Sequence, residues 1–238
     1  MPRFLIAAAL VAASVTVCAQ DAPRPVRVVI ASERLASLVD APQHFVLMRV
    51  EVARGQATTF AGPNGYVYVL SGRLEVAAGQ AQRVLAAGDA TYVRAGEPAR
   101  MRNTASGTTT LVHFLLVPGP AGETAWYSPG AKAAELYRTA SPIPRLESGP
   151  YEFSLTKVIG PPKVKPPLHR RSGAAIYYVL EGSATLHKES GTEPRKAAMV
   201  QYEPSDFIHT WENSGTVPLV LLQANVSREG APEIIFLR

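Results

Sequence analysis

The fold is decided by the stretch Leu168–Asn213, which reads LHRRSGAAIYYVLEGSATLHKESGTEPRKAAMVQYEPSDFIHTWEN. Near its start, the β-rich run Ile176–Leu180 is closed by Glu181 and Gly182, a pattern typical of a short strand followed by a turn. Alternate side chains of a strand share one face. We therefore expect His169 and Arg171, at the start of the stretch, to share one face of a strand, and His209, near its end, to lie on a face of another strand.

These residues resemble the two signature motifs of the cupin superfamily. In that family the first motif is His-x-His, a Glu four residues later and a Gly seven residues after the Glu. His169 and Gly182 fit this spacing. The second motif is Pro-x-Gly, a His three residues after the Gly and an Asn four residues after the His. Pro204, His209 and Asn213 fit that spacing.

Three positions depart from the motifs. Arg171 stands where the second His is expected, Ala175 where the Glu is expected, and Asp206 where the Gly is expected. The resemblance therefore implies the fold, and it says less about the chemistry. The implied fold is all-β, with two tandem cupin domains (jelly-roll β-barrels) joined by a short helical linker.

An internal repeat supports two copies of one unit. Identical residues recur 110 positions apart without a gap, namely Tyr68 and Tyr178, Val69 and Val179, Leu70 and Leu180, Gly72 and Gly182, Asn103 and Asn213, and Leu111 and Leu221. A repeat of this kind is the mark of a duplicated structural unit. We predict an N-terminal cupin domain over residues 26–118, a linker over 119–149 and a C-terminal cupin domain over 150–238.

The linker is predicted to contain one helix. Ser128 is suited to the N-cap, Pro129 suits the first helical position, and Ala131–Tyr137 are mostly good helix formers. The prolines Pro142 and Pro144 would end it.

The first residues have the pattern of a secretory signal peptide, predicted over 1–19. Arg3 precedes the largely apolar run Phe4–Val17, and cleavage is expected after Ala19. The run is shorter than the roughly 20 residues of a membrane-spanning helix. An alternative is a lipoprotein acylated at Cys18, against which the bulky Val17 argues. We expect an exported, periplasmic protein without membrane attachment beyond this leader.

Composition excludes some partners. The formal net charge is only +5, and no run of Lys and Arg is longer than the pair Arg170-Arg171. Nucleic acid is therefore not an expected partner. The single cysteine, Cys18, lies in the predicted leader, so the mature chain would have no thiol chemistry.

The predicted pocket lies in the C-terminal barrel. We expect six side chains there, contributed by His169, Arg171, Tyr177, His209, Trp211 and Gln223. An arginine with two histidines and aromatic walls is suited to a small anion, because guanidinium binds a carboxylate or phosphate with two parallel hydrogen bonds. Ordinary packing of the aromatics and histidines is the alternative reading.

The resemblance also implies a divalent metal (Fe, Mn, Zn, Cu or Ni), which cupins usually hold through three His and one Glu. Only His169 and His209 remain as ligands here, and Arg171 cannot donate a lone pair. We therefore expect either no metal or one weakly held metal. The equivalent positions of the first unit, Thr59, Ala61, Gly65 and Ala99, predict no metal centre there.

Three functions remain open at this point. The first is an exported bicupin that binds a small anionic molecule in the C-terminal barrel. The second is a metal-dependent enzyme of the dioxygenase or isomerase type that uses His169 and His209. The third is a structural protein that forms a homodimer through its outer strands.

Overall fold

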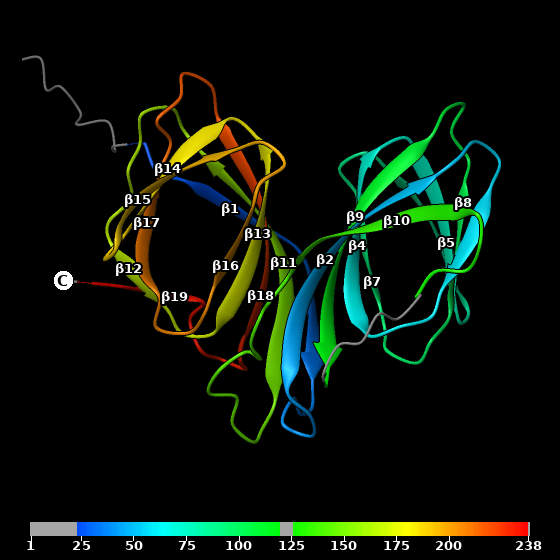
Figure 1. Ribbon diagram of the computed structural model, residues 1–238, viewed down its shortest axis with the longest axis horizontal. Coiled ribbons are helices and arrows are strands. Elements are labelled where there is room, and N and C mark those ends of the chain that lie inside the picture. Colours follow the sequence, from blue (N-terminus) through cyan, green and yellow to red (C-terminus); the bar gives the residue numbers. More distant parts are fainter. Residues whose placement is uncertain (1–22, 120–125, 238) are drawn as a thin grey trace, which may run out of the picture.

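The structure, a computed structural model, describes residues 23–119 and 126–237, which form 19 strands in four sheets (Figure 1). Within these residues there is no helix, so the all-β expectation is confirmed and the helical linker is not found. No helix of the described residues is long and apolar enough to cross a membrane. The predicted leader, residues 1–19, lies outside the described residues.

The first unit is a sandwich of a five-stranded and a four-stranded sheet. The larger sheet has the order β10-β2-β9-β4-β7 and the smaller one β3-β8-β5-β6. Their strands are β2 (Gln43–Val52), β3 (Ala57–Phe60), β4 (Asn64–Ser71), β5 (Arg73–Ala78), β6 (Ala81–Ala86), β7 (Ala90–Val93), β8 (Ala99–Asn103), β9 (Thr109–Pro118) and β10 (Ala131–Arg138).

The second unit repeats this plan. Its sheets have the orders β1-β11-β18-β13-β16 and β15-β14-β17-β12-β19. Their strands are β1 (Val26–Leu35), β11 (Tyr151–Gly160), β12 (His169–Arg171), β13 (Ala174–Glu181), β14 (Ser183–Lys188), β15 (Gly191–Lys196), β16 (Val200–Glu203), β17 (Ile208–Glu212), β18 (Leu219–Arg228) and β19 (Ile234–Phe236).

The two units exchange one strand in each direction. Strand β1 belongs by sequence to the predicted N-terminal domain, but it pairs antiparallel with β11 of the second unit. Strand β10 lies in the predicted linker, but it pairs antiparallel with β2 of the first unit. Figure 1 shows β1 among the strands of the second unit and β10 among those of the first. The exchange ties the two jelly rolls together, because each exchanged strand is hydrogen-bonded within one unit and leads along the chain into a strand of the other.

The predicted linker helix is wrong, because its residues form β10. Ala131, Ala133 and Glu135 have good helix propensity, but propensity is a weak preference that tertiary pairing overrides. The open edge of β2 offers a full ladder of partners, from Ala131 opposite Val52 to Arg138 opposite Val46. Backbone pairing with an existing sheet therefore decides the conformation.

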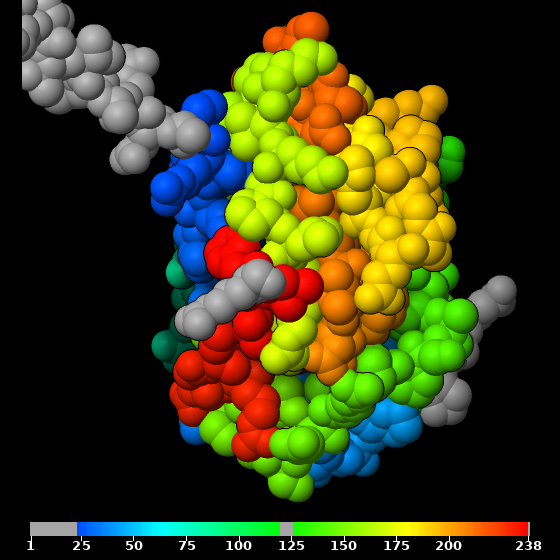
Figure 2. Space-filling view, turned by 90° about the vertical axis from the view of Figure 1, so that its left-hand side faces the viewer, coloured from blue at the N-terminus to red at the C-terminus, as the bar shows by residue number. Residues whose placement is uncertain are grey.

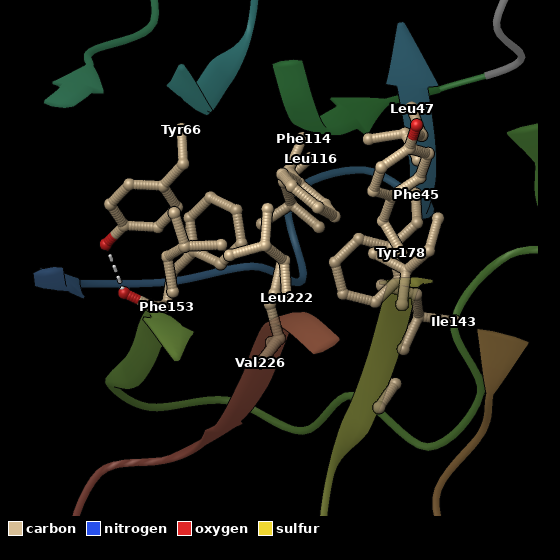
Figure 3. Close-up of a cluster of buried hydrophobic side chains, with 14 of the residues drawn as sticks. Phe45, Leu47, Tyr66, Phe114, Leu116, Ile143, Phe153, Tyr178, Leu222 and Val226 are labelled. Atoms are coloured by element: carbon tan, nitrogen blue, oxygen red, sulfur yellow. Dashed lines mark hydrogen bonds between the residues drawn. The ribbon is translucent and has the colours of Figure 1, made fainter. Parts of the chain in front are cut away.

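The five-stranded sheets pack face to face and form the largest core, between the two units (Figure 3). Alternate residues of one strand serve different cores. Tyr178 belongs to the core between the units, whereas Tyr177 and Val179 face the interior of the second jelly roll. Strand β9 also lies between two cores and is buried on both faces, which explains its nearly unbroken apolar run.

Tyr66 and Phe153 join the units at the centre of this core. Their ring centroids are 4.8 Å apart, and the Tyr66 hydroxyl donates to the Phe153 carbonyl over 2.6 Å. We expect Tyr66→Phe to lower the free energy of unfolding by about 1–2 kcal/mol, because it removes a buried hydrogen bond and leaves an acceptor without its donor. Urea unfolding measures the change, and unaltered stability would show that this bond contributes nothing.

The repeated residues of the sequence have structural roles in both units. Gly72 and Gly182 end their strands with φ of 88° and 82°, a conformation that favours glycine. The Asn103 side chain donates to the Val52 carbonyl over 2.8 Å, and Asn213 donates to the Gly160 carbonyl over 2.9 Å. These repeated residues therefore hold turns and contribute to the fold of both units.

Candidate functional site

Strands β12 and β17 bring the two motif histidines together. His169 and His209 are directly opposite each other in the ladder, and their ring centroids are 4.4 Å apart. His209 is fully buried and His169 is nearly so. The prediction that these two residues lie in one place inside the second unit is confirmed.

Arg171 is also inside, and it is fully buried. Its Nε donates to Glu203 Oε2 over 2.8 Å, and neither side chain has any exposed surface. The sequence left open whether Arg171 points inward or pairs with Glu203 or Glu212. The structure pairs it with Glu203, while Glu212 lies 2.7 Å from His187 Nε2.

Glu203 was not among the predicted site residues. It lies on β16, directly opposite Ala175 on β13. The Trp211 indole donates to Glu203 Oε1 over 2.7 Å. His209 Nε2 lies 2.9 Å from the same oxygen, although its direction is outside hydrogen-bond geometry. The carboxylate is therefore the centre of the polar network.

The charge state of Glu203 follows from its neighbours. Burial alone would raise its pKa, but the positive charge of Arg171, then His209 and the Trp211 hydrogen bond, outweigh burial and lower the pKa to about 2. Glu203 is therefore a carboxylate at neutral pH, and the guanidinium of Arg171 balances its charge.

The histidine rings are held through Nδ1. His169 Nδ1 donates to the Pro167 carbonyl over 3.1 Å, and His209 Nδ1 donates to the Phe207 carbonyl over 3.0 Å. Burial, with the nearby His209, lowers the pKa of His169 to about 4. At neutral pH His169 is therefore uncharged and keeps a lone pair on Nε2.

Gln223 connects this network to the first strand of the chain. Its Oε1 accepts from the Tyr177 hydroxyl at 3.0 Å, from Arg27 Nη1 at 3.0 Å and from Arg171 Nη2 at 3.4 Å. Arg27 also forms an ion pair with Glu233. Because Arg27 lies on β1, the exchanged strand completes the site.

A cavity of about 720 Å³ opens above this network. It is bounded by the residues before and within β1, by the loop that precedes β12 and by the C-terminal segment, which meet on the face of the second unit shown in Figure 2. The predicted residues His169, Tyr177 and Trp211 line it. Arg171, His209 and Gln223 do not line it and are fully buried.

The mouth of the cavity carries positive charge that the sequence did not predict. Arg24, Arg27 and Lys165 line it, and no aspartate or glutamate of the described residues does. Arg24 precedes β1 and Lys165 lies in the loop before β12. Only the fold brings these segments together, so sequence spacing carried no signal for them.

The equivalent space in the first unit is filled by side chains. Phe60, His113 and Tyr127 pack there, with the Phe60 and His113 centroids 4.4 Å apart. His113 Nδ1 lies 2.6 Å from the Tyr127 hydroxyl, so this histidine is a hydrogen-bonded core residue. Tyr127 pairs with Phe60 just as Ile235 pairs with Arg170 in the second unit. The closing segment therefore fills the first jelly roll with an aromatic ring.

Comparisons with known proteins agree with this architecture. The family model described as "Cupin domain" matches residues 50–116. No protein with curated function shows significant similarity. Solved structures do. Oxalate decarboxylase from Bacillus subtilis, whose description names Mn(II) centres, has a TM-score of 0.56 at 15% identity, over 87% of this chain and 74% of that one. A formate complex of oxalate decarboxylase from Lactobacillus farciminis has a TM-score of 0.56 at 15% identity, over 89% of this chain and 88% of that one.

The residues present do not fit a divalent metal of the kind that the fold family implies. The guanidinium of Arg171 pairs with Glu203, the carboxylate of this network, and Glu203 Oε2 already accepts from Arg171 Nε at 2.8 Å. A fixed positive charge at this distance opposes a dication by several kcal/mol at an effective dielectric near 20. The described residues also contain no group of three His, Cys, Asp or Glu side chains placed to hold a metal.

The motif spacing, the matched family model and the two similar jelly rolls lead to one statement. Residues 50–116 match the cupin-domain model, and the chain has the bicupin fold of the similar solved structures.

Proposed function

We propose that the second unit binds a small organic anion with an apolar body, and that it does so without a tightly bound metal. The observation that carries this proposal is the cavity of about 720 Å³, which has apolar walls, a cationic mouth and no carboxylate among its described lining residues. Its volume lies within the range of about 300–1,000 Å³ that is usual for small-molecule sites.

The walls favour an apolar or aromatic body. Tyr177 and Trp211 have ring centroids 5.3 Å apart and form one side. Aliphatic side chains form the rest, from Val158, Leu219, Leu221 and Ile234. Aromatic side chains beside aliphatic ones give a ligand a large dispersion surface and, at Trp211, a stacking surface.

The mouth favours a negative charge. Arg27 is already paired with Glu233, so the cations best placed for a ligand are Arg24 and Lys165. Among residues 23–119 and 126–237, the one polar contact of Lys165 Nζ is with His187 Nδ1 at 3.4 Å. A charge-assisted hydrogen bond from either residue to a carboxylate is stronger than a neutral one.

Arg171 has a different role from the one that the sequence suggested. Its charge is balanced by Glu203 and its side chain is fully buried, so it supports the floor of the cavity instead of meeting the ligand charge. His169 Nε2 supplies an acceptor at this floor, which suits a hydroxyl or amide donor on the ligand.

A matched pair of probes tests the proposal. We expect 2-naphthoate to bind about tenfold more tightly than its neutral carboxamide, since only the acid gains a charge-assisted bond at the mouth. Tryptophan fluorescence in the presence of a chelator follows both titrations. Lys165→Gln should remove most of the difference, whereas Lys132→Gln, which deletes the same charge from β10 in the other unit, should leave it unchanged.

Two outcomes would contradict the proposal. One is that neither probe binds in the chelator-treated protein. The other is that the acid and the carboxamide bind equally well to the wild-type chain.

The exported location, the binding of one small molecule and the absence of a nucleic-acid partner remain part of the proposal. A metal-dependent enzyme is the competing function. It would need Arg171 to leave the ion pair that it forms with Glu203. Metal content separates the two functions.

A further inference from the structure

The glutamate that the cupin motif expects on β13 is absent, and a glutamate of the neighbouring strand β16 lies directly opposite its position. The motif position is Ala175, and the residue directly opposite it in the ladder is Glu203 on β16. Directly opposed residues of an antiparallel pair have neighbouring Cβ atoms on the same face of the sheet. Glu203 therefore offers a carboxylate to the space that a glutamate at position 175 would reach.

A second replacement faces the first. Arg171 occupies the motif position of the second histidine, and its Nε donates to Glu203 Oε2 over 2.8 Å. Its guanidinium carbon lies 5.1 Å from the centroid of the Tyr177 ring, and its Nη1 has no hydrogen-bond partner in the described residues. The cation is thus held inside the jelly roll by one carboxylate, by the Gln223 amide oxygen and by one aromatic face.

The remaining two motif residues keep one feature of metal-binding histidines. Both histidines direct Nδ1 to a backbone carbonyl, which turns Nε2 of each ring away from the backbone; Nε2 of His209 lies 2.9 Å from Glu203 Oε1. This outer hydrogen bond is typical of metal-binding histidines. A simple internal ion pair between Arg171 and Glu203 would not require either histidine to be held in this way.

We infer that the guanidinium of Arg171 takes the place of a metal ion in a buried network whose other groups, His169, His209 and Glu203, are of the side-chain types that bind metals. One substitution then separates this chain from a metal-binding protein. The inference does not depend on the proposed ligand, because it concerns the buried network and not the cavity above it.

The direct test is Arg171→His, which removes the cation and adds a third imidazole. We expect the chelator-treated variant to bind one equivalent of Ni(II) or Mn(II) at least about 100-fold more tightly than the wild-type chain, because the fixed opposing charge is gone. Isothermal titration with the metal alone gives both stoichiometry and affinity. Adding Glu203→Gln or His209→Ala to the variant should abolish the gain.

The matched control is Arg171→Gln, which removes the same charge without adding an imidazole. It should bind metal more weakly than Arg171→His. Equal affinity of the two variants would show that loss of charge alone explains the effect and would overturn the inference. A folded Arg171→His protein, shown by circular dichroism, that binds no metal would overturn it as well.

A measurement on the unaltered chain keeps the inference testable if Arg171→His does not fold. Excess Ni(II) or Mn(II) should leave the melting temperature of the wild-type protein unchanged. A metal-dependent rise that disappears in His209→Ala would show that the site already accepts a metal beside the guanidinium, which contradicts the inference. Naphthoate binding is not involved in any of these outcomes, so the proposed function can fail or hold separately.

Discussion

Arg171→Met is expected to lower the free energy of unfolding by about 3–5 kcal/mol, because it leaves the fully buried Glu203 carboxylate without its cation. The truncation removes the Nε bond of 2.8 Å and the contact of the guanidinium with the Tyr177 ring. Urea unfolding at pH 7 followed by circular dichroism measures the loss.

A matched control uses the same substitution at an exposed ion pair. Arg102 and Glu75 are 2.6 Å apart, but their side chains keep 48% and 21% of their surface exposed. Arg102→Met should therefore cost no more than about 1 kcal/mol. If Arg171→Met costs as little as Arg102→Met, the buried pair does not support the site.

A double variant separates the pair from the loss of a charge. Arg171→Met combined with Glu203→Leu should recover most of the stability lost in Arg171→Met, because apolar replacement of a whole buried ion pair is often neutral. Failure to recover would show that other groups of the network, such as the Trp211 indole that donates to Glu203, dominate the effect.

The second large effect is a loss of stability in acid that depends on His113. Burial lowers the pKa of His113 to about 3, so between the ordinary histidine value near 6.5 and pH 3 only the unfolded chain binds this proton. Unfolding is therefore favoured as the pH falls through this window, by about 1.4 kcal/mol per pH unit. From pH 7 to pH 4.5 the contribution of this residue is about 2–3 kcal/mol.

His113→Gln should flatten the pH profile by this amount, even though it loses packing against Phe60. Tyr127→Phe is the matched control, because it removes the hydroxyl 2.6 Å from His113 Nδ1 but keeps the titrating ring. The control should lower stability and keep the slope. A His113→Gln profile parallel to the wild-type profile would contradict the assignment.

Other groups act in known directions over the same range. The lowered pKa of His169, about 4, adds a loss of the same sign as pH falls from 6.5 to 4. The lowered pKa of Glu203, about 2, gives stability that is fully present above its ordinary value near 4.5 and is lost only as pH falls towards 2. Measurements above pH 4.5 therefore report the histidines.

Much of the fold could be predicted from the sequence because its determinants are local or repeated. Gly72 and Gly182 have the same left-handed turn conformation, and Asn103 and Asn213 hold equivalent loops, so the 110-residue offset has a structural cause. The linker helix could not be judged in this way. Ala131–Arg138 have helical propensity, and only the free edge of β2 makes them a strand.

The site was predicted in part for a similar reason. His169, His209, Tyr177 and Trp211 follow from motif spacing and strand alternation. Glu203 was missed. Its equivalent in the first unit, 110 residues earlier, is the apolar core residue Val93. A charged residue in place of a core valine was therefore a signal that the repeat could have given. Arg24 and Lys165 carried no signal, because their approach depends on the exchange of β1 between the units.

The most direct test of the central claim is the metal content of the full chain, purified without a histidine tag and measured by inductively coupled plasma mass spectrometry after exposure to Mn(II), Zn(II) or Ni(II). If Arg171 and Glu203 stand in place of a metal centre, the protein will contain far less than one metal ion per chain. About one ion per chain in the wild type, lost in His209→Ala, would contradict the claim and favour the metal-dependent enzyme.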